Sequence, residues 1–523
     1  MRILAALSAA VAAAFQAPAT EIPDREVAAI FEDLTNAAGD GRPAPPLRIV
    51  AESTTAWRIA WFDPTPGRRA IYIEQQTLNV CRRGTLAPHY RDCIALILGH
   101  ELAHFYKDHS RLLDFARAEA SPDTDRERRA LEAQADEVGA FYAALAGYDS
   151  VGIAGEVLKA TYEYFRVPSD IPGYPGLPAR RQGLDDARAK LTGLLPLFNA
   201  GTVLFLTKHY LEAARCFDQV SRAFPSRELL NNSGVARLMA ALDALGGREP
   251  FAFPTEMDPD SRLAGVNARQ PVSPDKLAAA ALSSFDKAVA ADSKYVPALV
   301  NRSLALSVLG RTSEALGAAD RATAIARQFS DPGGAADAAI AHGIAVHQAG
   351  DDAQARRDFE SAVERSPLVA RANLKVLDHA LPTAAPSCSD AVPQRERVSG
   401  KKPEQLRSLI DGKARISVEE SFEDNEGLAV YPLAGPDFLG IVIEMQRTAV
   451  SALITKMDYS GCSARSICLG AGLEEVTARY ACPGMAGKYG GGQFVVYPEA
   501  RLVLDFGSNS RVRRWIAFAE DAL

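Results

Sequence analysis

The pattern of apolar and polar positions divides the chain into several kinds of segment. Near the N-terminus, residues 47–50, 57–61 and 70–73 alternate between apolar and polar side chains, which predicts β-strands. Residues 94–104 are apolar almost throughout and predict a buried helix. From about residue 194, small and apolar residues recur at helical spacing, and strand-like runs return near the C-terminus. The pattern therefore predicts a multidomain, mainly α protein.

The predicted buried helix contains an H-E-x-x-H motif. His100 and His104 lie one turn apart on one helix face, so both imidazoles can reach a single metal ion. Zn²⁺ accepts imidazole nitrogens, and a catalytic zinc site keeps one position open for water. Glu101 is placed to take a proton from that water. The motif predicts metal-dependent hydrolysis; the alternative is a histidine pair packed in a core.

A second helical stretch, with the pattern E-x-x-A-D-x-x-G-A, begins at Glu132. The two motifs in this order resemble the HtpX-type zinc metallopeptidases (peptidase family M forty-eight), which include CAAX prenyl proteases and periplasmic BepA-like proteins. The resemblance implies a gluzincin-type α+β metallopeptidase domain over residues 20–193. It implies that Glu132 is the third Zn²⁺ ligand and that Asp136 orients a ligand histidine. The alternative for Glu132 is a solvated carboxylate in a charged stretch.

Family members often carry H-P-S-x-x-x-R further along, with the histidine acting at the active site. This chain keeps Pro175 and Arg180 but has Tyr174 at the histidine position. Its hydroxyl could donate to a developing oxyanion, as in other zinc peptidases. It could equally be an ordinary packed aromatic, and the sequence leaves both readings open.

The family also has a small sheet before the active-site helix, and an edge strand of that sheet borders the cleft. The resemblance assigns this role to Ile71, Tyr72 and Ile73, which would hold an extended peptide by backbone pairing. A plain structural strand is the alternative.

Residues 194–380 predict an array of helical repeats. Small residues, an aromatic residue and a final proline recur at the offsets of a tetratricopeptide repeat (TPR) at Gly201, Ala213, Phe217 and Pro225, and again from Gly343 to Pro367. Four units are expected, at about 194–227, 228–293, 296–329 and 336–369, the second split by an insertion at 246–274. Such a TPR α-solenoid usually forms a groove for protein partners.

A linker is expected at residues 381–405, followed by a small α+β domain at 406–523. The linker is rich in Pro, Ser and charge. Strand-like runs at 440–445, 493–497 and 501–506 and a helical stretch at 473–480 define the domain. Its role is not indicated beyond protein binding.

Composition and the N-terminus bear on the compartment. The net charge of −7 and the lack of a basic stripe argue against nucleic acid as a partner. Residues 1–19 read as a secretory signal with an A-x-A cleavage site, too short to be a membrane anchor. No other stretch is long and apolar enough to span a bilayer. Export to a bacterial periplasm is expected.

Seven cysteines suit an oxidising compartment. Cys81 and Cys93 flank the loop before the H-E-x-x-H helix, and Cys462 and Cys468 could close a second short loop. Cys388 and Cys482 are further candidates, which leaves Cys216 as the odd, buried thiol. Pairing cannot be deduced from sequence alone.

The sequence thus supports two functional hypotheses. The first is a periplasmic zinc endopeptidase in protein quality control, with misfolded or unassembled envelope proteins as substrates by analogy with the family. The second is a periplasmic chaperone or assembly scaffold whose peptidase site is vestigial or shut.

Overall fold

The computed structural model describes residues 24–38, 44–51, 59–65, 68–109, 122–168, 171, 173–223, 227–246, 251–255, 273–378, 396–420, 427–456, 459–480, 483, 485–489, 492–507 and 509–522. Over this part the chain is mainly helical and carries a separate β-sheet region near its C-terminus, as predicted. It divides into two compact units, one ending at Leu191 and one beginning at Thr192. The expected signal at residues 1–19 lies outside the described residues.

The first unit contains a three-stranded sheet of β1 (Leu47–Val50), β2 (Ala60–Asp63) and β3 (Ala70–Glu74). β3 is the central strand, parallel to β1 and antiparallel to β2. The prediction that Ile71, Tyr72 and Ile73 form an edge strand is therefore wrong, because other strands pair with both sides of β3. β2 is an edge of this sheet instead.

The helices of the first unit are α2 (Asp24–Ala38), α3 (Gln75–Cys81), the 3₁₀ turn η1 (Gly84–His89), α4 (Tyr90–Tyr106), α6 (Pro122–Leu145), α7 (Ser150–Phe165) and the first part of α8 (Leu177–Leu206). α4 is the central helix of this unit. Most of its residues are buried, and α2, α6 and α7 pack against it. A Cys81–Cys93 disulfide fastens α3 to α4, which confirms the first predicted pairing.

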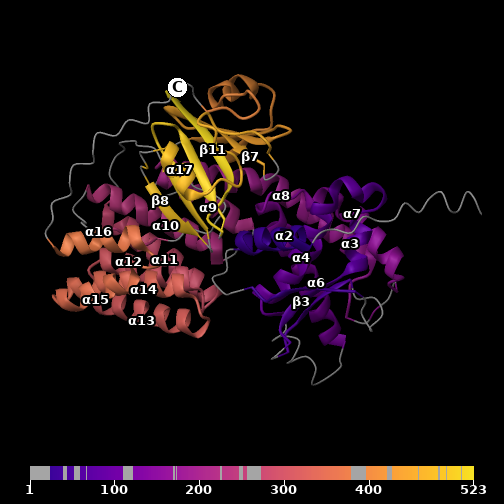
Figure 1. Ribbon diagram of the computed structural model, residues 1–523, viewed down its shortest axis with the longest axis horizontal. Helices are drawn as coiled ribbons and strands as arrows, with labels where there is room; N and C mark the ends of the chain where they lie inside the picture. The colour runs from indigo at the N-terminus through magenta and orange to yellow at the C-terminus, as the bar shows by residue number, and fades with distance from the viewer. Residues whose placement is uncertain are drawn as a thin grey trace, which may run out of the picture. The chain divides into compact units, whose positions relative to one another are not determined.

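Helices follow one another in pairs through the second unit (Figure 1). They are the end of α8 with α9 (Tyr210–Ala223), α10 (Arg227–Leu245) with α11 (Pro274–Ala291), α12 (Val296–Val308) with α13 (Thr312–Gln328), and α14 (Pro332–Gln348) with α15 (Asp352–Ala362), followed by α16 (Pro367–Leu377). Neighbouring helices along this series pack on one another. The pairs occur in the order of the four predicted units, but the fourth pair spans residues 332–362 instead of the predicted 336–369. Residues 247–250 and 256–272 of the predicted insertion lie outside the described residues.

A glycine on the first helix faces a phenylalanine on the second in three of these pairs. A Cβ added to Gly234 would lie 2.5 Å from the ring of Phe285, and one added to Gly343 would lie 2.7 Å from the ring of Phe359. Gly201 meets Phe217 in the same way at 3.0 Å. The small residue lets the paired helices approach closely, which is the packing that the recurring small and aromatic positions predicted.

α8 is the one helix among the described residues that is long and apolar enough to cross a membrane by length and composition. Its most apolar window has a mean hydropathy of 1.4, and 61% of that window is buried inside the protein. The core helix of a soluble protein passes the same test.

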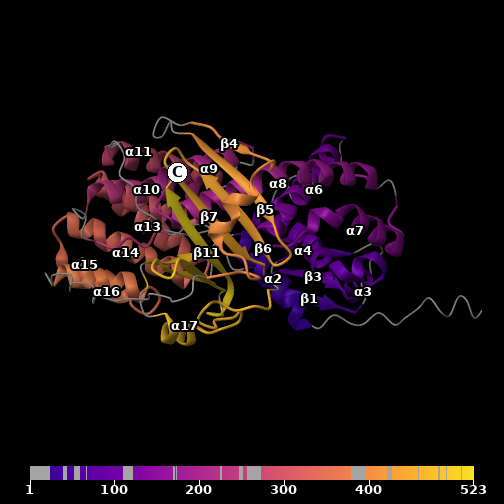
Figure 2. The ribbon, with the colours of Figure 1, turned by 90° about the horizontal axis from the view of Figure 1, so that it is seen from above.

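The C-terminal region is an eight-stranded antiparallel sheet, with strands in the order β4-β5-β6-β7-β11-β10-β9-β8. The strands are β4 (Ile416–Val418), β5 (Leu428–Ala434), β6 (Phe438–Glu444), β7 (Thr448–Thr455), β8 (Met485–Tyr489), β9 (Gly492–Tyr497), β10 (Leu502–Phe506) and β11 (Val512–Ala522), with α17 (Leu473–Arg479) and the 3₁₀ turn η2 (Pro403–Leu409) beside them. Figure 2 shows β4 to β7 and β11 side by side. β6, β9, β10 and α17 coincide with predicted elements.

This region begins earlier than predicted. Val398 and Leu406 are fully buried in the same hydrophobic core as Trp515. Residues 396–405 therefore belong to the C-terminal fold and not to a linker, because an extended connector would leave these side chains in water. The rest of the predicted linker, residues 381–395, lies outside the described part of the chain.

A Cys462–Cys468 disulfide closes a short loop in this region, which confirms the second predicted pairing. Cys216 is a buried free thiol, also as predicted. Cys388 and Cys482 lie outside the described residues.

Candidate metal centre

The helices α4 and α6 cross in direct backbone contact, with one glycine on each. A Cβ added to Gly99 would lie 2.6 Å from the carbonyl oxygen of Gly139. One added to Gly139 would lie 2.5 Å from the backbone nitrogen of His100. Protein interiors do not absorb such overlaps without moving a helix. The two glycines therefore let side chains from both helices meet at one point.

His100, His104 and Glu132 bring three donor atoms together there. Nε2 of His100 lies 3.0 Å from Nε2 of His104 and 3.3 Å from Oε2 of Glu132. Nε2 of His104 lies 3.6 Å from Oε1 of Glu132. Ligands about 2.0–2.1 Å from a tetrahedral Zn²⁺ ion are about 3.3 Å from one another. The cluster could hold a metal ion, and its donors and spacing are compatible with zinc without being specific to it.

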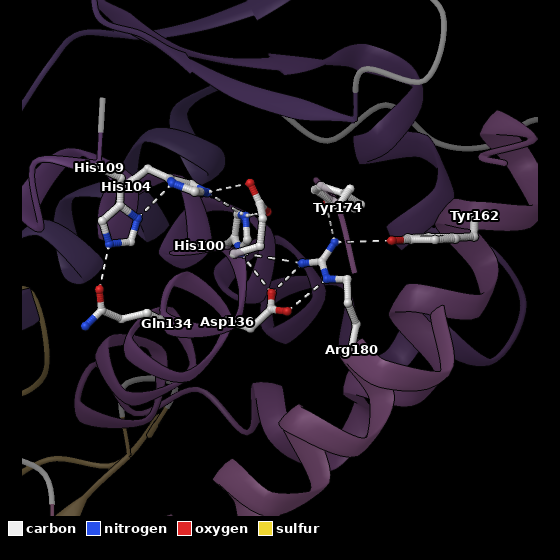
Figure 3. Close-up of polar contacts among 9 residues, drawn as sticks. His100, His104, His109, Gln134, Asp136, Tyr162, Tyr174 and Arg180 are labelled. Carbon is white, nitrogen blue, oxygen red and sulfur yellow. Dashed lines mark hydrogen bonds and ion pairs between the residues drawn. The ribbon is translucent and has the colours of Figure 1, made fainter. Parts of the chain in front are cut away.

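Asp136 and Arg180 contact His100 at its Nδ1 atom (Figure 3). Nδ1 of His100 lies 2.8 Å from Oδ1 of Asp136, so Nε2 of the ring faces the other donors. Arg180, in the first turn of α8, donates from Nε to Oδ2 of Asp136 at 2.8 Å and from Nη2 to Oδ1. Burial would raise the pKa of Asp136, but the charge of Arg180 and the hydrogen bond from His100 lower that pKa to about 2. The carboxylate stays ionised and fixes the ring orientation.

Charge holds the donor cluster together. Burial would lower the pKa of His100, but Asp136 and Glu132 outweigh it and raise that pKa to about 10. Burial would likewise raise the pKa of Glu132, but hydrogen bonds to His100 and His104 hold it well below its ordinary value. In the absence of a cation, a protonated imidazole therefore supplies the positive charge that the carboxylates require.

A third histidine extends the cluster on the far side of His104. Nδ1 of His109 lies 3.0 Å from Nδ1 of His104, and Nε2 of His109 lies 2.8 Å from Oε1 of Gln134. His109 is 1% exposed, and burial, followed by the charge of His104, lowers its pKa to about 4. His109 is accordingly neutral at pH 7. It is not one of the three clustered donors.

Glu101 lies at a cavity of about 100 Å³ beside the donors. The wall is mostly apolar, and its polar members are His100, Glu101, Asp136, Thr161, Tyr174 and Arg180. Burial raises the pKa of Glu101. A backbone hydrogen bond from Phe62 to Glu101 places the edge strand β2 next to this carboxylate. The site thus combines a carboxylate of raised proton affinity with space for a small group.

Tyr174 reaches the same cavity from the segment before α8. Its hydroxyl accepts a hydrogen bond from Nη1 of Arg180, which also reaches the hydroxyl of Tyr162 at 3.5 Å. Burial raises the pKa of Tyr174 well above its ordinary value. The hydroxyl therefore keeps its proton, and because Arg180 is the donor in their contact, that contact leaves the proton of Tyr174 available for another acceptor.

The structure brings together His100, Glu101, His104, Glu132 and Asp136, which the two motifs singled out. Tyr174 joins His100, Glu101 and Asp136 at the cavity. The residues Ile71, Tyr72 and Ile73 lie in the central strand of the sheet and do not line it. The sequence did not identify His109, Gln134 or the pairing of Arg180 with Asp136. Only the retained arginine of the H-P-S-x-x-x-R pattern was a signal for any of these.

Comparison with known proteins adds no assignment: no protein-family model matches the chain, and no curated protein matches it.

Proposed function

We propose that this chain is a zinc-dependent endopeptidase. The observation that carries the proposal is the meeting of His100, His104 and Glu132 at the spacing of a tetrahedral zinc site. The order of the H-E-x-x-H and E-x-x-A-D-x-x-G-A motifs, with its resemblance to HtpX-type metallopeptidases, supports the same reading. The first unit would then be a gluzincin-type domain, and the helix pairs of the second a TPR array.

A Zn²⁺ ion bound by the three donors would polarise the scissile carbonyl and lower the pKa of a water molecule. Glu101 then accepts a proton from the attacking water and passes it to the leaving amine. Its raised pKa supports this role, because a carboxylate that acts as both base and acid works best when its pKa approaches the working pH. Tyr174 donates to the carbonyl oxygen as negative charge develops on it.

The edge strand β2 gives the substrate a place to bind. Its neighbour β3 occupies one side, and the backbone of Phe62 lies against Glu101. An extended peptide that adds to a sheet edge forms main-chain hydrogen bonds irrespective of its sequence. A protein substrate unfolded enough to offer such a strand is therefore the class that the site favours. Misfolded or unassembled envelope proteins would meet this description.

The disulfides Cys81–Cys93 and Cys462–Cys468 support a working place in an oxidising compartment, of which a bacterial periplasm is the one we propose. The helix pairs of the second unit would select protein partners. A chaperone or assembly scaffold is the second candidate function, because the second unit makes up more than half of the chain.

Casein or an unfolded envelope protein, incubated with the zinc-loaded chain, tests the proposal. We expect cleavage that a chelator abolishes and that added Zn²⁺ restores. Glu101→Gln should bind zinc but cleave nothing, since only the proton acceptor is lost. Retained cleavage in this variant would exclude Glu101 as the base. Suppressed aggregation without cleavage by the wild-type chain would favour the scaffold.

A further inference from the structure

Among the described residues, no carboxylate contacts Nδ1 of the proposed ligand His104, unlike Nδ1 of His100. His100 has Asp136 at Nδ1, which leaves its Nε2 for the metal. The group at Nδ1 of His104 is instead a second imidazole, that of His109. A neutral imidazole carries one donor and one acceptor nitrogen. The nitrogen that holds the proton of His104 therefore determines which nitrogen holds the proton of His109.

Only one order leaves Nε2 of His104 free to bind a metal. If Nδ1 of His104 carries the proton, Nδ1 of His109 must accept it, and the proton of His109 then lies on Nε2. Nε2 of His109 is 2.8 Å from the amide oxygen of Gln134, which can only accept. The reverse order would need a donor at Gln134 and would put a proton on Nε2 of His104, between the metal donors.

The backbone supports this arrangement. α4 ends at Tyr106, and Asp108 adopts a left-handed conformation with φ of 53°, which turns the chain before His109. A non-glycine residue in this region is uncommon and is held there by its surroundings. The turn brings the buried ring of His109 edge-on to that of His104, with ring centroids 5.0 Å apart.

We propose that His109 and Gln134 are positioning residues for the metal: Gln134 fixes the proton of His109 on Nε2, and His109 fixes the proton of His104 on Nδ1. The chain thus orients its two ligand histidines by different means, a carboxylate for His100 and an imidazole–amide relay for His104. The inference rests on the proposed metal site but not on peptide hydrolysis.

Zinc affinity, measured by competition with a chromogenic chelator, tests the relay without an activity assay. His109→Phe keeps a ring but removes the acceptor, and we expect affinity to fall about 10- to 100-fold. His109→Asn puts an amide oxygen near the position of Nδ1 and should restore most of it. An unfolding midpoint for each metal-free variant shows whether packing has been lost, and rescue by Asn separates a lost acceptor from lost packing.

Gln134 allows a matched set of variants, because the residue is exposed. Gln134→Glu offers only acceptors and should retain wild-type affinity or exceed it, whereas Gln134→Met should weaken it. Ala133→Glu adds the same charge one residue away and controls for a general electrostatic effect. If Gln134→Glu and Ala133→Glu raise affinity equally, the gain is one of charge alone, and an unchanged Gln134→Met would then exclude the relay.

Nitrogen-15 spectra of the zinc-loaded chain with labelled histidines give a direct readout. We expect His104 to bind through Nε2 and to carry a slowly exchanging proton on Nδ1, which exchanges rapidly in His109→Phe. Metal binding through Nδ1 of His104, or wild-type affinity in His109→Phe, would overturn the relay and leave the metal site standing. A wild-type chain that binds no zinc would overturn the proposed function itself.

Discussion

Gly99 and Gly139 touch each other through their backbones where α4 crosses α6, and each leaves no room for a Cβ on the other. This contact sets the distance between the helix that carries His100 and His104 and the helix that carries Glu132. The spacing of the candidate metal ligands therefore depends on two glycines, which have no side chains to bind a metal themselves.

Gly139→Ala is expected to destabilise the chain and weaken the metal site together. The added methyl would meet backbone atoms, which cannot rotate away, so the helices must separate, at about 1–3 kcal/mol of stability. Chemical denaturation and zinc stoichiometry would measure both effects. Gly183→Ala is the matched control: it lies within α8 with nothing within 4 Å of an added Cβ and should stabilise slightly. Unaltered zinc binding in Gly139→Ala would contradict the spacing argument.

Arg180→Met should cost about 3–5 kcal/mol in the metal-free chain, because the buried carboxylate of Asp136 loses the guanidinium that binds both its oxygens and keeps only the imidazole of His100. Asp136→Asn strands the guanidinium in the same way. The double variant Asp136→Asn/Arg180→Met should therefore lose less than the sum of the two single losses, as urea denaturation would show. Additive losses would mean that the two groups do not stabilise each other.

Tyr174→Phe decides between the two readings that the sequence left open. If the hydroxyl donates to the oxyanion, kcat should fall about 100-fold while zinc affinity is unchanged. A merely packed aromatic predicts little change in kcat. Tyr162→Phe is the control, because this hydroxyl also contacts Arg180 but does not line the cavity. Equal losses in both variants would point to an effect through Arg180.

We expect His209 to make the stability of the second unit depend on pH. It is buried between Glu212, at 3.8 Å, and Glu520 of β11, at 3.3 Å. Burial would lower its pKa, but the two carboxylates raise it to about 9. The folded pKa exceeds the unfolded value of about 6.5, so this contribution is complete below about pH 6.5 and is lost as pH rises through 9.

The contribution of His209 is on the order of 3 kcal/mol. The measurement is the free energy of unfolding of wild type and His209→Gln between pH 6 and 10. We expect the gap between the two to be widest at the acid end and to close toward pH 10. A constant gap for His209→Gln would refute the assignment.

His100, His104 and Glu132 come together as expected, because each motif is local and the resemblance to a known family supplied the pairing of the two motifs. A spacing of four residues fixes His100 against His104, and Glu132 is fixed against Asp136 in the same way, whatever the rest of the fold does. His109 could not be found, because only the left-handed turn at Asp108 returns it to His104. A single sequence gives no sign of such a turn at an aspartate.

Longer-range features were predicted less well for the same reason. Strand alternation in residues 70–73 was recognised, but which strands flank β3 depends on pairing with residues 47–50 and 60–63. Val398 was assigned to a linker because the surrounding composition is polar. Its burial depends on a core built from residues as distant as Trp515.

The Cys81–Cys93 bond makes the crosslink beside the candidate site depend on the redox state of the surroundings. Thiols remain reduced in the cytosol, so a newly synthesised chain would reach its destination with α3 not yet tied to the helix that holds His100 and Glu101. Oxidation would then act as a maturation step. Under the proposed function and location, the peptidase would lack this crosslink in the compartment where other proteins are being synthesised and would acquire it only after export.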